Sequence, residues 1–266
     1  MPRINLDDLL DKQFKALFYG EPGVGKTTLC GSVLDVPEML PVLWCEVDGG
    51  IMTLRNKILQ HRQDITVLAL KTDKDVSDME KILYSETPFK TVVLDSLTEF
   101  YWLLMRLHHS SQGRSVDFPD GTDYRTMGSR VIEMLRKIRD QGTTHFITTG
   151  TTNVLENRIS GELHWAVALP GQLPRQVVNF FDILGYLSVS LRVRTDGQVR
   201  ETRRRLQVQP YNNVHAKTRV SWTKLGAVID DPTMRKIFDD YMSVDDSVIE
   251  AEPQIITEGE IEDDAS

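Results

Sequence analysis

The sequence predicts an α/β fold in which helices cover both faces of a mostly parallel central sheet. Two observations support this prediction. Short apolar runs alternate with stretches of helical periodicity along most of the 266 residues, which is the pattern of successive βαβ units. A glycine-rich loop, residues 20–27, joins the first apolar run to the first helical stretch. A chain of this length buries enough apolar surface to need no disulfide bonds.

The first half of the chain is expected to contain four strands, each followed by a helix. The first strand covers residues 14–19, and the first helix opens at about residue 28. Asp75 or Ser77 is the expected N-cap of the third helix, because both side chains can accept a backbone N–H. The other expected elements are, in order, strand 41–47, helix 52–60, strand 64–71, helix 75–85, strand 90–95 and helix 96–109.

The second half begins with a polar loop over residues 110–124, which is long for a compact domain and is therefore a candidate functional segment. Strands expected over 183–194 and 199–209 form a C-terminal β-hairpin, because Asp196-Gly197 between them is a typical hairpin turn. The other expected elements are, in order, helix 125–141, a fifth strand 144–149, a polar stretch 153–161, an extended segment 162–169, helix 173–181 and helix 232–241.

The distribution of charge divides the chain into two parts. Nine of the 39 acidic residues lie in residues 245–266, which contain no Lys or Arg, so 30 acidic and 31 basic residues remain in 1–244. We therefore expect one folded domain over 1–244 and a disordered acidic tail over 245–266, because like charges and few apolar residues cannot form a core. The tail is either a solubilising extension or a segment that mimics nucleic acid or docks a partner.

Two features indicate the compartment. Cys30 and Cys45 lie in apolar runs without metal-ligand spacing, so we expect buried thiols in a reducing cytosol. No apolar run approaches the roughly 18 residues of a membrane span, and the N-terminus does not read as a signal peptide. The expectation is a soluble cytoplasmic protein with no membrane contact.

Residues 20–27 read Gly-Glu-Pro-Gly-Val-Gly-Lys-Thr, a full G-x-x-x-x-G-K-[ST] phosphate loop between a strand and a helix. Its glycines let backbone N–H groups turn inward around an anion, and the helix N-terminus adds positive potential. Lys26 is expected to reach the β- and γ-phosphates, and Thr27 to offer its hydroxyl to Mg²⁺. The motif predicts a nucleoside triphosphate site formed by Gly20, Glu21, Pro22, Gly23, Val24, Gly25, Lys26, Thr27 and Thr28.

Acidic residues end two of the expected strands. Asp95 closes the fourth strand at the edge where the phosphate loop lies, so it is a candidate Mg²⁺ ligand, acting through water. Glu46 and Asp48 share one face of the second strand, and one of them is the candidate to orient or deprotonate an attacking water. Asp48 is otherwise only a turn acid before Gly49-Gly50. The hydroxyl-rich end of the fifth strand, residues 148–153, either reports the γ-phosphate to the next loop or is an ordinary polar boundary.

Together these residues resemble the RecA-like branch of P-loop ATPases, and most specifically small phage ATP-binding proteins that include RecA-like single-strand annealing proteins. RecA-like recombinases carry Asp-x-Glu-Gly between the phosphate loop and the Walker B strand. Here the stretch reads Glu46-Val47-Asp48-Gly49, with the two acid types exchanged. The resemblance covers residues 14–225 and implies ATP and Mg²⁺ as cofactors, ATP hydrolysis with a turnover that the exchange leaves open, and the host cytoplasm as the compartment if a phage encodes the chain. It also implies that the fifth strand lies between the Walker B strand and the phosphate-loop strand.

The same resemblance implies contact with single-stranded DNA after the fifth strand, over residues 152–176. Arginines suit the phosphates and an aromatic ring suits base stacking. Trp165 is equally compatible with a place in the core. The candidate DNA-binding residues are Asn153, Arg158, Trp165 and Arg175. By contrast, helical spacing predicts core positions, rather than a stacking platform, for Tyr101, Trp102, Leu104 and Met105.

Ala216-Lys217-Thr218-Arg219 matches a basic K-x-R element of these phage ATPases. The resemblance implies that Lys217 and Arg219 reach the nucleotide of a neighbouring subunit and stabilise charge on the transferring phosphoryl group. The alternative is a basic face of a hairpin. A second cluster either binds nucleic-acid backbone or pairs with the acidic tail, and strand alternation divides it between two faces: Arg200, Arg203, Arg204 and Arg205.

The leading interpretation is an ATP-binding and ATP-hydrolysing RecA-like protein that binds single-stranded DNA in phage recombination or replication, by strand annealing or strand pairing. The implied partners are single-stranded DNA, further copies of the chain in a ring or filament, and a single-strand-binding protein or another replication partner. The alternative is an AAA-like loader or remodelling ATPase that acts on a protein such as a helicase. A third reading is a nucleotide-gated binding module with little turnover.

Overall fold

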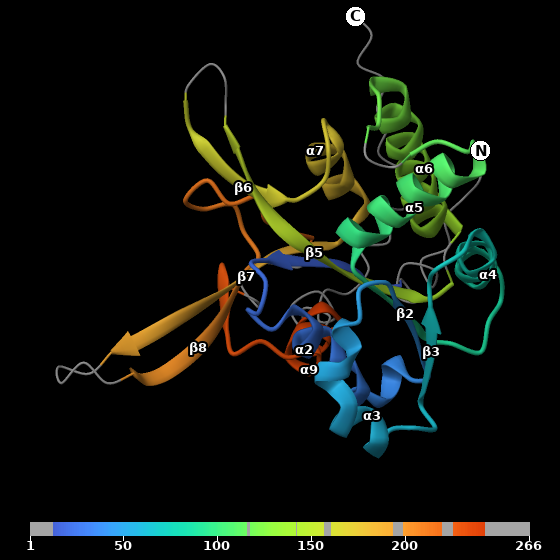
Figure 1. The fold of residues 1–266 in the computed structure, drawn as a ribbon. Coiled ribbons are helices and arrows are strands. Elements are labelled where there is room, and N and C mark those ends of the chain that lie inside the picture. The colour runs from blue at the N-terminus through green and yellow to red at the C-terminus, as the bar shows by residue number, and fades with distance from the viewer. Residues whose placement is uncertain are drawn as a thin grey trace, which may run out of the picture.

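A computed structural model describes residues 13–115, 118–141, 143–156, 161–193, 199–219 and 226–242, and the structural statements below concern these residues. They form a mixed sheet with helices on both faces (Figure 1). The strand order along the sheet is β10-β8-β7-β1-β5-β4-β2-β3. The α/β class predicted from the sequence is confirmed.

The part of the sheet from β7 to β3 is parallel. Strand β5 lies between β4 and β1, as the resemblance to RecA-like ATPases implies. The carboxyl ends of these strands meet at one edge of the sheet, which is where ligands bind in open α/β folds. The parallel strands are β1 (Lys15–Gly20), β2 (Val42–Glu46), β3 (Ile65–Ala69), β4 (Thr91–Asp95), β5 (His145–Glu156) and β7 (Ile183–Val193).

Helices bury one apolar core on each face of the sheet. Figure 1 shows α4, α5, α6 and α7 on one face, and α2, α3 and α9 on the other. Phe100 and Phe146 belong to the first core, and Phe18 and Trp44 to the second. No helix in the described ranges is long and apolar enough to cross a membrane. The helices are α2 (Lys26–Gly31), α3 (Arg55–Gln60), α4 (Asp73–Tyr84), α5 (Leu97–Ser111), α6 (Gly121–Gln141), α7 (Leu173–Val177) and α9 (Met234–Met242), with short 3₁₀ turns η1 (Ser32–Asp35), η2 (Pro37–Met39), η3 (Gly50–Leu54) and η4 (Val178–Phe180).

The expected N-cap of α4 is wrong. Thr72 is the cap, and its hydroxyl accepts the backbone N–H of Asp75 while the Asp75 carboxylate accepts the backbone N–H of Thr72. This reciprocal pair is a capping box, so Asp75 acts at the third helical position instead. The helix consequently begins at Asp73, two residues earlier than the sequence pattern indicates.

Helix α6 also begins earlier than expected, at Gly121 rather than residue 125. The Asp120 carboxylate accepts the backbone N–H groups of Thr122 and Asp123 and so satisfies the first turn. Asp123 in turn accepts both Nη groups of Arg114, at 2.9 and 3.0 Å, and its carboxylate lies 3.0 Å from Nε2 of the buried His109. The long loop expected over 110–124 is therefore shorter and anchored to α5.

The fifth strand is much longer than expected. Beyond Thr151 it leaves the central sheet and pairs antiparallel with β6 (Leu163–Val167), in a register from Thr152↔Val167 to Glu156↔Leu163. The expected loop is therefore a β-hairpin, which projects from the sheet in Figure 1. The extension of β5 begins with polar residues, because its pairing with β6 lies outside the buried part of the sheet. The apolar pattern of the sequence therefore did not indicate a strand here. Arg158 lies outside the described residues.

The predicted C-terminal hairpin forms, but its first strand is part of the central sheet. The first four residues of β7 pair parallel with β1, and from Tyr186 onward β7 pairs antiparallel with β8 (Val199–Gln207). The sheet then ends in β10 (Val228–Asp230), while β9 (Lys217–Thr218) pairs with the start of β7. The turn at Asp196-Gly197 and the tail over 245–266 lie outside the described residues.

Acid should weaken the fold through His145. Burial, followed by the charges of Lys15 and Lys90, lowers the pKa of His145 to about 4, and its Nδ1 accepts the backbone N–H of Phe14 at 2.9 Å. Between about pH 6.5 and 4 the unfolded chain takes up a proton that the folded chain excludes, so this stabilisation is complete above pH 6.5 and is lost as pH falls. The change approaches about 3 kcal/mol in the free energy of unfolding. Urea unfolding across this range should show the loss in the native chain and not in His145→Asn. A difference between the two proteins that does not vary with pH would contradict the assignment.

Candidate nucleotide site

The phosphate loop lies where the central strand β1 meets α2, at the carboxyl edge of the sheet. A side chain at Gly20 would collide with the Leu187 carbonyl of β7, so only glycine fits. Gly23 and Gly25 have φ values of 80° and 99°, the left-handed conformation that side chains disfavour. The loop therefore has the backbone freedom that an anion cradle requires.

The side chain of Lys26 folds back over the phosphate loop. Its Nζ donates to the carbonyl oxygens of Gly20 and Glu21, both at 2.9 Å. Burial lowers the pKa of the ammonium, and the nearby carboxylates of Asp95, Glu21 and Asp48 oppose that change. The cation is thus held at the mouth of the loop by two neutral carbonyl groups, which a phosphate anion can replace.

Thr27 and Asp95 meet as the sequence predicts. Thr27 Oγ1 donates to Asp95 Oδ2 at 2.8 Å, and the Thr149 hydroxyl donates to Asp95 Oδ1. Burial raises the pKa of Asp95, while the hydrogen bonds from Thr149 and Thr27 oppose the rise. The hydroxyl-rich end of β5 therefore contacts the acid at the end of β4, a contact that sequence reasoning did not assign.

Glu46 and Asp48 occupy different environments. The Glu46 carboxylate is buried and accepts backbone N–H groups of the turn that follows it, together with Nε1 of Trp44 at 3.3 Å. Burial raises the pKa of this carboxyl, whereas its backbone hydrogen bonds oppose the rise. Asp48 is exposed, and its carboxylate accepts the backbone N–H of Gly50 at 3.1 Å and interacts with the Glu46 carboxyl. The donors to Glu46 in this acidic turn, residues 46–51, are Asp48 N, Gly49 N and Ile51 N.

Gly50 marks the point where three oxygen atoms converge. A Cβ at Gly50 would lie 3.2 Å from Asp48 Oδ1, 3.3 Å from Thr27 Oγ1 and 3.5 Å from Asp95 Oδ2. These are hard oxygen donors of the kind that Mg²⁺ prefers, and Mg²⁺ usually takes its other ligands from water and substrate phosphates. The described residues contain no group of three His, Cys, Asp or Glu that could hold a metal ion. In the sequence, the signal for this convergence of oxygen atoms was the glycine pair, Gly49 and Gly50, after Asp48.

Lys217 and Arg219 make their contacts away from the phosphate loop. Strand β9 pairs with Ile183 and Leu184, which lie beside Ala16 and Leu17 near the start of β1, whereas the loop follows its end. Lys217 Nζ donates to Val178 O at 2.9 Å, and Arg219 forms a 3.0 Å ion pair with Asp182. Neither residue reaches the phosphate loop of its own chain, so a role at a nucleotide requires a second copy.

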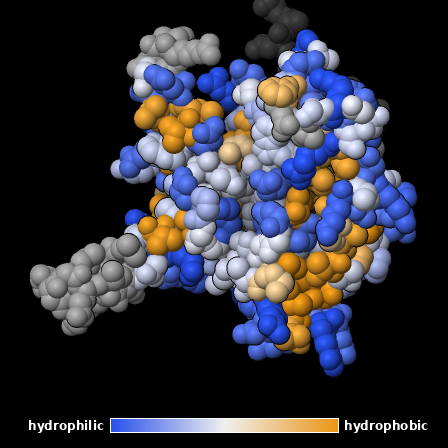
Figure 2. Space-filling model, in the orientation of Figure 1, coloured by the Kyte–Doolittle hydropathy of each residue, from blue (hydrophilic) through white to orange (hydrophobic). Residues whose placement is uncertain are grey.

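The candidate DNA-binding residues have different environments on and around the β5–β6 hairpin. Asn153 on β5 and Arg175 on α7 are exposed. Trp165 is half-buried and packs against the core, and its backbone carbonyl accepts the Tyr19 hydroxyl at 2.9 Å. This environment favours the core reading of Trp165. Figure 2 shows hydrophobic surface on the hairpin, to which the exposed Val154 and Leu163 belong.

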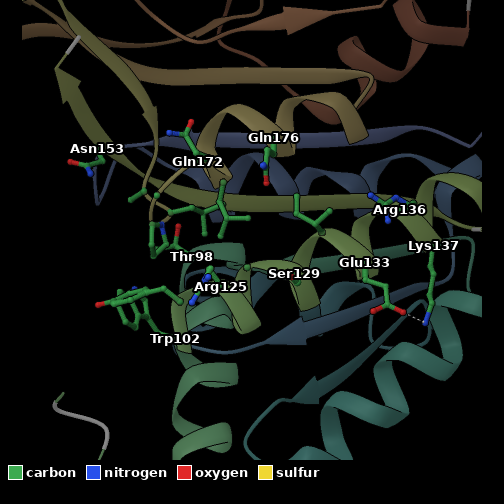
Figure 3. A pocket seen from close by; sticks show the side chains of 18 of the residues that line it. Thr98, Trp102, Arg125, Ser129, Glu133, Arg136, Lys137, Asn153, Gln172 and Gln176 are labelled. Atoms are coloured by element: carbon green, nitrogen blue, oxygen red, sulfur yellow. Dashed lines mark ion pairs between the residues drawn. The ribbon is translucent and has the colours of Figure 1, made fainter. Parts of the chain in front are cut away.

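A groove of about 1440 Å³ runs between α5, α6 and the segment from β6 to α7, with Asn153 at its edge. Figure 3 shows Trp102, Thr98 and Arg125 on the same part of its wall. Trp102 is half-buried and packs edge-on against Tyr124, with 6.4 Å between ring centroids. Trp102 packs against the apolar core, as its helical spacing predicts, and also lines the groove, whereas Tyr101, Leu104 and Met105 are fully buried. A helical pattern cannot separate these cases, because Trp102 lies at the margin of the apolar stripe.

Three comparisons relate the chain to known proteins. No curated protein matches it. The crystal structure of the RadB recombinase is similar with a TM-score of 0.46 and 16% sequence identity, over 76% of this chain and 84% of that chain. Likeness at this level carries no argument about function. Residues 12–220 match the AAA_24 family, described as an AAA domain. Because this match spans most of the chain and includes the phosphate loop and Asp95, the chain belongs to this family of AAA domains.

Proposed function

We propose that the chain is a RecA-like ATPase that binds single-stranded DNA in phage recombination or replication, by strand annealing or strand pairing. The observation that carries the ATPase half is the convergence of Thr27, Asp48 and Asp95 around Gly50, beside Lys26. A cation, a hydroxyl and carboxylates are the groups that P-loop NTPases use around the terminal phosphates of a triphosphate.

In the proposed reaction the backbone N–H groups of the loop bind the phosphates, and Lys26 exchanges its carbonyl contacts for phosphate oxygens. Thr27 and Asp95 would hold Mg²⁺, which neutralises charge on the β- and γ-phosphates when bound. Asp48 orients a water molecule and accepts its proton as the oxygen–phosphorus bond forms and the bond to ADP breaks. Glu46 positions Asp48, because its carboxylate binds the Asp48 and Gly49 N–H groups.

The DNA half rests on the groove and the hairpin beside it. Trp102 offers a ring for base stacking, Arg125 is exposed on the same wall for phosphates, and Asn153 adds an amide. Thr98 of the groove accepts the backbone N–H of Thr151 at 3.1 Å, two residues from Asp95-contacting Thr149. The middle of β5 thus connects the groove to the nucleotide site.

Lys217 and Arg219 would act in a ring or filament of further copies. Their distance from the loop of their own chain is compatible with supply in trans, and Arg219 is half-exposed in its contact with Asp182. In that role they would stabilise charge on the phosphoryl group held by the neighbouring subunit.

The test is a titration of labelled single-stranded oligonucleotide at low salt, with and without ATP and Mg²⁺, together with ATPase turnover. We expect oligonucleotide binding and DNA-stimulated turnover, and Trp102→Ala should weaken oligonucleotide binding about tenfold because one stacking contact is lost. Leu59→Ala is the control, since Leu59 is exposed on α3 on the other face of the sheet. A native chain that binds no single strands, but associates with a protein in an ATP-dependent manner, would favour the loader function. An unchanged Trp102→Ala would contradict the groove.

A further inference from the structure

Arg204 of β8 lies on the phosphate loop, although 180 residues separate it from Val24. In β8, Arg204 shares a sheet face with Leu206, because side chains two residues apart point the same way. Leu206 is fully buried in the core that also contains Leu29 and Cys30 of α2. Arg204 lies two residues before Leu206 on the same face of β8. Its side chain therefore lies above the start of α2.

Two observations describe the contact between Arg204 and the phosphate loop. Nε of Arg204 donates to the carbonyl oxygen of Val24 at 3.1 Å. A Cβ at Gly25 would lie 2.5 Å from Nε and 3.2 Å from Cδ of Arg204, so the glycine makes room for the arginine. The backbone φ of Gly25 already favours glycine, and the side chain of Arg204 occupies the space that a Cβ would take.

The backbone of Arg204 is fixed by the neighbouring edge of the sheet. Its N–H donates to Asp231 Oδ1 at 3.1 Å, and its carbonyl accepts the Asp231 N–H at 2.8 Å. Asp231 has a φ of 44°, a conformation in which a non-glycine residue is uncommon. The side chain of Arg204 is thus presented to the loop by a strand that is held on both sides, by β7 and by the residues after β10.

We propose that Arg204 is a positioning residue of the nucleotide site, which holds the loop in its anion-cradling form from the outside. The Val24 carbonyl and the Gly25 N–H belong to one planar trans peptide and point in opposite directions. A cation that holds the carbonyl outward therefore turns the Gly25 N–H inward and polarises it toward a phosphate. This inference rests on the proposed nucleotide function and adds a residue that the motif alone does not contain.

The test is the affinity of Arg204→Ala for ADP and for ATP, measured with fluorescent nucleotides, together with KM and kcat. Because the cradle holds phosphates that both nucleotides share, we expect both affinities to fall by about tenfold, the effect of losing one charge-assisted hydrogen bond. KM should rise by a similar factor while kcat at saturating ATP stays unchanged, as expected for uniform binding. Arg204→Lys, which keeps a cationic donor, should recover part of the affinity.

Two further variants control the experiment. Arg205→Ala removes the adjacent arginine, which points to the other face and pairs with Asp230 at 3.1 Å, and it should bind nucleotide as the native chain does. Asp231→Gly keeps the backbone conformation and removes the acceptor for Arg204 N–H, so it should weaken both nucleotides less than Arg204→Ala does. Native affinity in Arg204→Ala, or a loss confined to ATP with a fall in kcat, would overturn the positioning role. A native chain without nucleotide affinity would instead contradict the proposed function.

Discussion

Lys26→Ala is expected to abolish ATP binding at ordinary protein and nucleotide concentrations, with a loss of affinity of at least about a hundredfold. Lys26 places its ammonium between two loop carbonyl groups, where it is partly desolvated and has a lowered pKa. Without that charge, the cradle offers only neutral N–H groups to a triphosphate. Calorimetric titration of ATP with Mg²⁺ should detect no binding, and turnover should fall to background.

Lys57→Ala is the matched control for this change. Lys57 lies on α3 and pairs with Asp35, away from the loop, so its removal should leave ATP affinity unchanged. Unfolding temperatures of both variants should stay close to that of the native chain, because neither lysine is in the apolar core. A Lys26→Ala chain that binds ATP within tenfold of native affinity would exclude the phosphate-loop site.

Asp48→Asn should lower kcat by about a hundredfold or more while ATP affinity stays within a few-fold of native. The exposed carboxylate of Asp48 faces the same space as the Thr27 hydroxyl and the Asp95 carboxylate. The amide keeps the shape of the side chain and its acceptor oxygen but cannot take a proton from water. Single-turnover hydrolysis with bound ATP measures the change without interference from product release.

Glu46→Gln should lower stability as well as turnover. The Glu46 carboxylate accepts hydrogen bonds on both oxygen atoms, and the amide NH₂ of glutamine would face N–H donors with no acceptor. We expect a loss of about 1–3 kcal/mol in the free energy of unfolding, and a fall in turnover that reflects the disordered acidic turn. If Glu46→Gln abolishes turnover without loss of stability while Asp48→Asn retains it, the roles of the two acids are reversed.

The sequence predicts best the parts of the site whose residues are contiguous in the chain. The phosphate loop is contiguous, and its glycines, lysine and threonine act on one ligand through local backbone geometry. Asp95 was predictable because the carboxyl end of a parallel strand lies at the edge of the sheet where the phosphate loop also lies. The exchange of acid types at residues 46 and 48 left two candidates, which differ in burial: Glu46 is buried and Asp48 is exposed.

Long-range pairing limited the remaining predictions. The pattern for β5 ended at Thr149 because the following residues are polar, yet they continue the strand by pairing with β6. Trp102 and Trp165 look alike in the sequence and both pack against the core, but only Trp102 also lines the groove beside α6. Local side-chain competition decided the cap of α4, where Thr72 and Asp75 exchange two hydrogen bonds.

By itself the sequence determined the α/β class, the phosphate loop and the acid that meets it, because each is encoded by local periodicity or by contiguous residues. The tertiary structure decided which acid faces the open site, which aromatic ring lines the groove, and that Arg204 braces the loop. These depend on residues brought together across the sheet by strand order, such as Arg204 and Val24. A motif records the residues that touch a ligand in sequence order, whereas the contacts that hold the motif in shape come from wherever the chain folds back against it.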